Sequence, residues 1–450
     1  RMPLLASARP RAWAMTSAGA QNIQALCAAA LLLAALILAI TGTGLLSAFA
    51  LLGCFLIGAA LAMPLLVRPI LAAAERAART PLLRWFWADT RQQLPGLSLA
   101  LMALLLAISA NIGVATMVSS FRLTFVSFLD QRLAPELYVE TASADEARRI
   151  ETAMAARAVA VLPLLTIEMQ SAGQPARLFG VRVGPTYREN WVFLDQDGAV
   201  WDRVEAGSAA VVNEQLARRT GLWVGDEVDI ASNLTLPIAG IVADYGNPRG
   251  QIVIGESLFR DLHPNVSARQ FGLCTDDPAA LRGDLVSELG IPESAIIDQV
   301  ALKSFSLEVF ERTFTVTAAL NVLTLAVAAF AMLMSLLTLA DLRVPQLAPV
   351  WAIGVTRRQI GRLELIRAAV FALFVCIFAV PVGLGLAWVL LAIINVEAFG
   401  WRLPMYLFPI DYGRLGLYAV LAAVAAALWP AWRLMRTPPA SLLKVFANER

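Results

Sequence analysis

The side chains that could carry chemistry in this 450-residue chain are few. It has one histidine, His263, in the turn-like sequence DLHPN, and two lysines, Lys303 and Lys444. A P-loop needs Gly-Lys-Ser/Thr to hold nucleotide phosphates, and each lysine here follows a leucine, so the chain contains no P-loop. No Cys/His cluster surrounds the histidine, which therefore predicts no metal site. We expect ATP hydrolysis, metals and cofactors to be absent from this chain.

Carboxylates are more numerous but form no recognisable acid/base pair. We interpret them as strand-end and turn residues: Glu168, Asp195, Asp197, Asp226, Glu227, Asp244, Asp276 and Asp277. Three of the four cysteines lie in apolar runs and Cys274 stands alone, which argues against a disulfide framework. The sequence thus predicts no catalytic residues.

The elements that carry these residues are those of a membrane protein. The chain is 58% hydrophobic and 16% charged, with a mean hydropathy of +0.67. Uncharged runs of about 18 residues or more can span a bilayer. There are six: Ile23 to Ile40, Leu45 to Val67, Leu97 to Val118, Phe314 to Leu339, Ala368 to Ile394, and Leu415 to Leu434. None contains a carboxylate or histidine, so an ion-coupled carrier is disfavoured, and Asn111 and Asn321 are predicted to form interhelical hydrogen bonds.

Arginine counts predict the orientation, because Lys and Arg are retained on the cytoplasmic side. The segments 68–95 and 341–367 and the C-terminal tail are rich in arginine, whereas the loop from Asn395 to Tyr412 has only Arg402. We therefore expect both termini to be cytoplasmic and the long segment 119–312 to lie outside. Segment 1–22 is a cytoplasmic N-terminal segment, expected to be truncated because the chain opens with Arg1 before Met2.

Segment 119–312 is predicted to be an α/β domain. Apolar residues at helical spacing after Phe121 and before Phe310 predict that the third and fourth runs continue as helical stalks. Between them we expect strands in ELYVE, VLPLLTIEMQ and ARLFGVRV and a helix over 144–158. The stretch AAVVNEQLARRTGLWVGDEVDI predicts a strand, a helix, a turn and a strand, and LPIAGIVADYGNPRGQIVIG predicts two further strands.

The most distinctive polar stretch between apolar runs is WAIGVTRRQIGRLELI, residues 351–366, which we call the basic segment. Each of its arginines would cost about 3 kcal/mol at the centre of a bilayer, so the segment must lie outside it. We expect Pro345 and Pro349 to break the helix before it, and Trp351 to lie at interfacial depth. Gly354 permits a sharp turn, and Thr356 can cap a new helix that begins near Arg357.

Charge alone leaves two interpretations of the basic segment: a topogenic loop without a partner, or a docking element for a separate energy-supplying protein. A resemblance favours the second. Residues 351–360 are similar to the coupling segment of FtsX-like ABC transporter permeases, which contacts an ATPase subunit, and TPPASLLKVFANER and GLWVGDEVDI also resemble family patterns. The resemblance implies an ATPase-coupling site formed by Trp351, Gly354, Thr356, Arg357, Arg358 and Gln359. The chain departs from the family at Pro345 and Gln346, and at Trp351 where arginine is common.

The fold implied is a polytopic α-helical membrane protein of about six transmembrane helices, with a large extracytoplasmic α/β domain inserted between helices 3 and 4. The resemblance further implies a bacterial inner-membrane protein of the MacB or lipoprotein-release type. Segments 96–118, 119–312 and 313–450, the last an FtsX-like domain with three spans, would form one permease module. Segment 23–67 would be the linker hairpin of a tandem permease whose first module is missing.

Two functions remain open. In the first, a partner ATPase moves the basic segment and tilts the fifth run, which Pro381 kinks, so that the outer domain exports or extracts lipid, lipoprotein or amphipathic compounds. In the second, the chain is an ATPase-linked scaffold that regulates an extracytoplasmic enzyme such as a cell-wall hydrolase. Expected partners are the ATPase, membrane lipids, a periplasmic adaptor or substrate protein, and a second permease module, but no nucleic acid. A membrane enzyme would need a reactive cluster that the sequence lacks.

Overall fold

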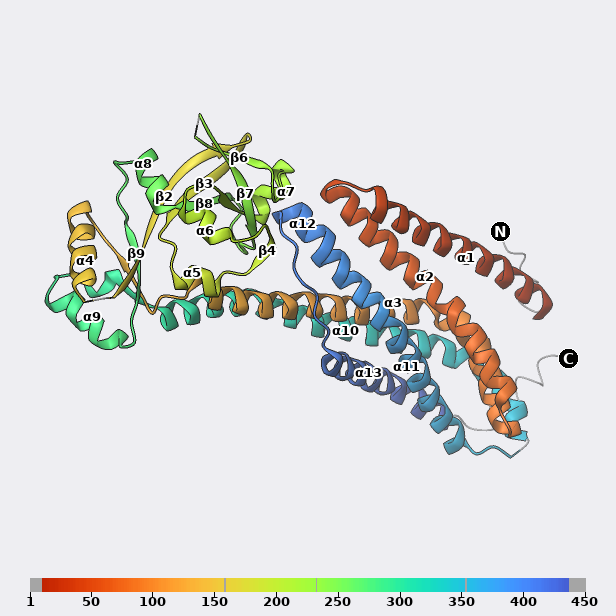
Figure 1. Cartoon of the computed structure of the whole chain (residues 1–450). Coiled ribbons are helices and arrows are strands. Elements are labelled where there is room, and N and C mark those ends of the chain that lie inside the picture. The colour runs from red at the N-terminus through yellow and green to blue at the C-terminus, as the bar shows by residue number, and fades with distance from the viewer. Residues whose placement is uncertain (1–9, 158, 232, 353, 437–450) are drawn as a thin grey trace. The chain divides into compact units, whose positions relative to one another are not determined.

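The computed structural model describes residues 10–157, 159–231, 233–352 and 354–436 and divides into two compact units (Figure 1). The helical unit contains Arg1–Ser119, Thr315–Ile394 and Met405–Arg450. The sheet unit contains Ser120–Phe314 and Asn395–Pro404. Two helices, α3 (Pro81–Arg132) and α10 (Gln299–Ala352), contribute residues to both units, as the predicted stalks require.

Long apolar helices build the helical unit. Besides α3 and α10 they are α1 (Pro10–Thr41), α2 (Gly44–Ala77), α11 (Arg357–Val389) and α13 (Pro409–Arg436). A π-helical turn, Leu390–Ile394, joins α11 to the short α12 (Asn395–Phe399). Within the described residues, five helical segments are long and apolar enough to cross a membrane, and α10 has a shorter apolar stretch, Val322–Leu337. All six predicted runs are therefore helical.

The expectation that Pro345 and Pro349 break the helix after the fourth run is wrong. Helix α10 continues past both and ends at Ala352. A proline removes only one backbone donor, and the neighbouring residues retain their own hydrogen bonds, so an apolar helix can continue through it. The chain reverses instead at Gly354. The segment 68–95 is also mostly helical, because α2 extends to Ala77 and α3 begins at Pro81.

Helices α3 and α11 cross at unusually close range in the helical unit. Ala379, Gly383 and Ala387 are small residues at helical spacing on α11, and Ala379 and Ala387 are fully buried. A Cβ atom on Gly383 would lie 2.7 Å from Cβ of Ile112. Nearby, the Thr324 hydroxyl donates to Oδ1 of Asn111 at 3.1 Å, which confirms the interhelical bond predicted for Asn111. The side chain of Asn321 lies outside the described residues.

We expect Gly383→Ala to lower the free energy of unfolding by about 1–3 kcal/mol, because the added methyl group must push Ile112 aside. Gly53→Ala is the matched control, since a Cβ atom there would meet nothing within 4 Å. That substitution should be neutral or stabilise by at most about 1 kcal/mol through helix propensity. Unfolding temperatures of the two variants in the same detergent measure the difference. Equal shifts would contradict a tight crossing at Gly383.

The sheet unit is built on one mixed sheet. Its described residues form ten strands in the order β10-β1-β9-β2-β3-β8-β5-β7-β4, with β6 paired to β7. The pairs β3/β8 and β5/β7 are parallel and the others are antiparallel. Their bounds are β1 (Leu137–Glu140), β2 (Ala160–Ser171), β3 (Gln174–Val181), β4 (Phe193–Gln196), β5 (Ala210–Asn213), β6 (Glu227–Ala231), β7 (Leu234–Val242), β8 (Gly250–Gly255), β9 (Gln270–Cys274) and β10 (Ile296–Asp298).

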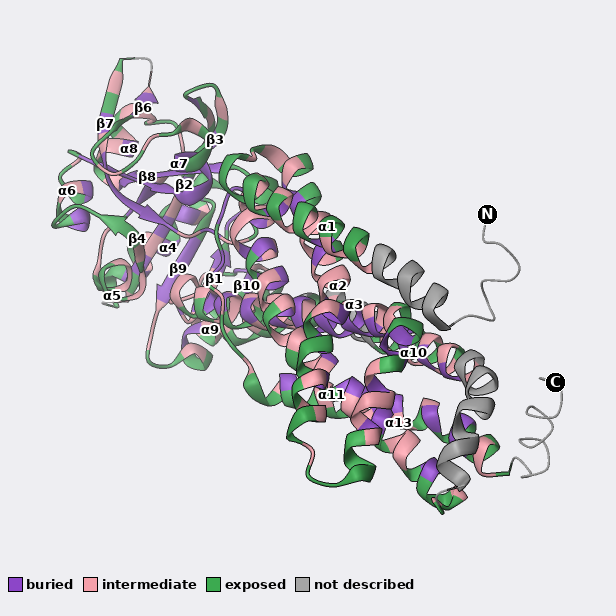
Figure 2. Cartoon of the chain, turned by 90° about the vertical axis from the view of Figure 1, so that its right-hand side faces the viewer, coloured by how far each residue is buried: buried purple, intermediate pink, exposed green. Residues whose placement is uncertain are grey.

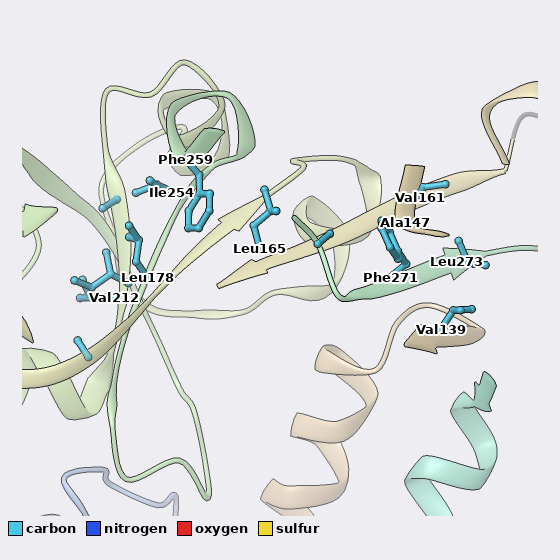
Figure 3. Close-up of a cluster of buried hydrophobic side chains, with 14 of the residues drawn as sticks. Val139, Ala147, Val161, Leu165, Leu178, Val212, Ile254, Phe259, Phe271 and Leu273 are labelled. Atoms are coloured by element: carbon cyan, nitrogen blue, oxygen red, sulfur yellow. The ribbon is translucent and has the colours of Figure 1, made fainter. Parts of the chain in front are cut away.

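Short helices connect these strands: α4 (Ala144–Ala156), α5 (Pro185–Asn190), α6 (Val200–Glu205), α7 (Glu214–Thr220), α8 (Glu256–Leu262) and α9 (Pro278–Ser287). Buried residues follow the strands (Figure 2). Leu165, Leu178 and Phe259 pack in the main core, and Phe271 and Val139 extend it toward β9 and β1 (Figure 3). A second cluster around Trp201 packs on another part of the sheet. Every strand and helix predicted for this region is present, which confirms an α/β domain.

Candidate functional site

The basic segment contains a turn followed by a capped helix start. Gly354 has a φ of +96°, a left-handed conformation that glycine adopts without strain. Thr356 is the N-cap of α11: its hydroxyl oxygen accepts from the backbone N–H of Gln359 at 3.3 Å. Gln359 Oε1 accepts in return from the backbone N–H of Thr356 at 2.8 Å, which completes a capping box. The predicted turn and cap are both confirmed.

The two faces of the first turns of α11 differ. Arg358 and Arg362 are exposed and Arg357 is half-buried, whereas Ile360 and Gly361 are buried. A Cβ atom on Gly361 would lie 2.6 Å from Sδ of Met435, so this face packs closely on the end of α13. The arginines therefore form the accessible side of a fixed helix start. Trp351 belongs to the last turn of α10, and its side chain lies outside the described residues.

A buried ionic cluster holds α11 to α3 ten residues further on. The Arg367 side chain is 2% exposed and lies between two carboxylates. It forms an ion pair with Asp89 of α3, donates to Glu364 Oε1 at 2.7 Å, and donates through Nε to the Thr90 hydroxyl at 3.1 Å. Gln93 also donates to Asp89, at 2.8 Å. We call Arg367, Asp89, Glu364 and Thr90 the Arg367 cluster; the sequence had assigned Arg367 only to a basic loop.

Segment Asn395–Pro404 is a further covalent connection between the two units. It belongs to the sheet unit, whereas the residues before and after it in the sequence belong to the helical unit. The backbone N–H of Arg402 donates to Glu214 Oε1 of α7 at 3.2 Å, and Glu214 is 2% exposed. A Cβ atom on Gly400 would lie 3.5 Å from Cα of Gln215. This contact places Arg402 in the sheet unit; the side of the membrane on which the loop lies stays a prediction.

Several of the side chains considered for chemistry make structural contacts within the sheet unit. Asp195 accepts from Trp223 Nε1 at 2.6 Å, Asp226 accepts from the Trp223 backbone N–H, and Asp277 caps α9. His263 ends α8, with its ring 5.3 Å from that of Phe259. Among the described residues, no group of three or more His, Cys, Asp or Glu could hold a metal ion, and the four cysteines are free.

Pro381 lies inside α11, and no element ends there. The irregular stretch is the π-helical turn Leu390–Ile394, which directly follows α11. Such turns occur frequently at functional sites. The kink at Pro381 stays a prediction.

Comparison with known proteins gives matches to two family models. Residues 97–279 match the MacB-like periplasmic core domain, and residues 318–439 match the FtsX-like permease C-terminal domain. The chain is 28% identical over 364 residues to the uncharacterized ABC transporter permease protein Rv0987 of Mycobacterium tuberculosis, which covers 75% of this chain. The match spans only 42% of that relative's length.

Two solved structures resemble the sheet unit weakly, each with 12% identity and a TM-score of 0.28. The extracellular domain of the ABC-type transporter YknZ from Gram-positive bacteria covers 36% of this chain and is itself covered to 97%. For the periplasmic region of MacB from Actinobacillus actinomycetemcomitans the shares are 38% and 90%. The domain assignment rests on the two family models. These models are consistent with the long apolar helices and with the mixed-sheet domain between α3 and α10. The chain therefore contains a MacB-like periplasmic core domain and an FtsX-like permease C-terminal domain, and it is a polytopic membrane protein with an extracytoplasmic domain.

Proposed function

We propose that this chain is a permease subunit that converts ATP hydrolysis by a separate ATPase into motion of its extracytoplasmic sheet domain. The observation that carries the proposal is the Arg367 cluster, which joins the start of α11 to α3. Helix α3 continues to Arg132 in the sheet unit, so one helix connects the cluster with the outer domain. A displacement of the basic segment would thereby reach the sheet domain through buried contacts.

The capping box and the buried Ile360 support docking at this place. A force applied to exposed Arg358 and Arg362 acts on a helix start whose other face is packed, so it moves the helix rather than deforming a loop. We further propose that the chain lies in a bacterial inner membrane with both termini cytoplasmic. The transported compounds would be lipids, lipoproteins or other amphipathic molecules taken up from the outer leaflet or beyond it. A periplasmic adaptor and a second permease module would complete the assembly.

Replacing both Arg357 and Arg358 by glutamate should abolish most of the stimulation of the ATPase subunit, because two charge reversals face the docked partner. ATP hydrolysis by the purified complex in nanodiscs is the measurement, and membrane insertion should be unchanged. We expect a loss of tenfold or more, as reversal of close interfacial charge pairs costs on the order of 2 kcal/mol or more.

The matched control is Arg148→Glu with Arg149→Glu, two adjacent exposed arginines of α4 in the sheet unit. This pair should leave ATPase stimulation intact. Unchanged stimulation by the Arg357 and Arg358 variant would refute the docking site. If both subunits instead co-purify with a periplasmic hydrolase and release no lipid from vesicles, the chain is a regulatory scaffold rather than a transporter.

A further inference from the structure

The sheet unit contains a cavity of about 430 Å³ that none of the preceding contacts explains. Its walls come from six strands that are consecutive in the sheet, β10, β1, β9, β2, β3 and β8, together with α5, the end of α3 and the start of α10. On β2, Leu162 and Leu164 face the cavity, while Val161 and Leu165 belong to the main core on the other face. Cavities of this size and apolar character bind small molecules in many proteins.

Aromatic side chains close the cavity opposite the strands. Tyr187 of α5 and Trp191 lie 5.2 Å apart by ring centroid, and both pack against Trp201 of the second cluster. Phe179 of β3 also lines the space. Rings that are already packed on one another provide a rigid apolar wall, so the cavity is formed before a ligand enters.

One polar atom in the cavity wall lacks a partner. The hydroxyl group of Tyr138 is buried and forms no hydrogen bond within the described residues. Burial raises the pKa of Tyr138 far above its ordinary value, so the group remains a neutral O–H donor. Buried polar groups are nearly always hydrogen-bonded, and an acceptor atom of a bound molecule would satisfy this one.

The charged groups of the wall do not call for a charged ligand. The Arg132 guanidinium lies 3.5 Å from the ring centroid of Trp191 and donates to the Ala243 carbonyl oxygen at 3.0 Å. The negative charge of Asp244 acts on Arg132 and balances it, and Glu140 of the wall is exposed to solvent. An ionic ligand would therefore gain little net attraction, whereas an uncharged one loses little hydration on entry.

We propose that this cavity binds a compact, uncharged apolar molecule that carries one hydrogen-bond acceptor. The acceptor bonds to the Tyr138 hydroxyl, and the apolar body packs between Leu162 and Leu164 on one side and the Tyr187 and Trp191 rings on the other. Binding does not depend on the ATPase or on motion of the sheet domain.

Benzophenone is a suitable probe because it is an apolar ketone with one acceptor and inserts on irradiation into neighbouring C–H bonds. The full chain in lipid nanodiscs is irradiated at increasing benzophenone concentrations, and adducts are mapped by peptide mass spectrometry. We expect saturable labelling of peptides that contain residues 134–140, 162–164 or 270–272. Benzophenone dissolved in the lipid will also label α1 and α2, and this labelling is the internal reference. It should continue to rise at benzophenone concentrations at which labelling of the cavity peptides has saturated.

Two variants test the site. Leu164→Trp should fill the cavity and reduce this labelling about tenfold, as steric changes in apolar pockets do. Tyr138→Phe keeps the ring and should raise the half-saturating concentration about fivefold through loss of one hydrogen bond. The control Leu194→Trp, on exposed β4, should change neither value. Circular dichroism checks that each variant is folded. Labelling equal to that of the unmodified chain in either cavity variant would overturn the proposal.

Discussion

Arg367→Met is expected to lower the free energy of unfolding by about 3–5 kcal/mol, because it removes a buried cation that balances two largely buried carboxylates, Asp89 and Glu364. Methionine fills much of the same volume, so lost packing contributes little. Reversible unfolding in a detergent and SDS mixture gives the stability, and ATPase stimulation in nanodiscs gives the functional effect. Both should fall together if the Arg367 cluster transmits motion from α11 to α3.

The matched control is Arg122→Met, which removes an arginine from α3, the helix that carries Asp89. Arg122 bonds Glu311 at 2.6 Å, but both side chains are more than half exposed, so the expected cost is at most about 1 kcal/mol. Adding Asp89→Asn to Arg367→Met should restore part of the stability by removing one carboxylate charge that Arg367 no longer balances. Similar losses from Arg367→Met and Arg122→Met would contradict a special role for the buried cluster.

Asn213→Ala should destabilise the sheet unit by about 3–4 kcal/mol, since it removes a cap and leaves several buried groups unsatisfied. The Asn213 side chain is fully buried. Its Oδ1 accepts from the backbone N–H groups of Leu216 at 3.1 Å and Gln251 at 2.9 Å, and its Nδ2 donates to the Arg249 carbonyl oxygen at 2.9 Å. One side chain thus joins β5, α7, β8 and the turn before β8.

The functional consequence follows from α7, which Asn213 caps and which carries Glu214, the acceptor for Arg402. Limited proteolysis of Asn213→Ala should therefore cleave segment 395–404 faster than in the unmodified chain. Asn190→Ala is the control: Asn190 donates only to the Thr186 carbonyl oxygen, at 2.9 Å, and its loss should cost about 1 kcal/mol. If Asn213→Ala exposes no new cleavage site there, α7 does not hold the segment in place.

Features set by neighbouring residues could be predicted from the sequence. Thr356 and Gln359 are three residues apart, so the cap depends only on local geometry. Strands β2 and β7 are long enough for their alternating or apolar pattern to be clear, and β1 and β5, of four residues each, were also predicted, whereas β4, β9 and β10, of four, five and three residues, were not. Length alone does not separate these strands; those that were missed form because their neighbours in the sheet supply hydrogen bonds.

Contacts between distant residues could not be predicted. Arg367 and Asp89 are 278 positions apart, and an arginine beside an apolar run normally indicates only the cytoplasmic boundary. Glu214 and Arg402 are separated by 188 positions, so membership of 395–404 in the sheet unit had no local signal. At Pro345 and Pro349 a local rule was available and failed, because the surrounding helix compensates for the missing donors.

The close crossing of α3 and α11 has a mechanical consequence. Gly383 fits against Ile112 only because it has no side chain, and its neighbours Val382 and Leu384 do. Sliding α11 along α3 by even one residue, a rise of about 1.5 Å, would bring a larger side chain into that contact. The crossing therefore resists sliding of α11 along α3, so the two helices keep their register along each other.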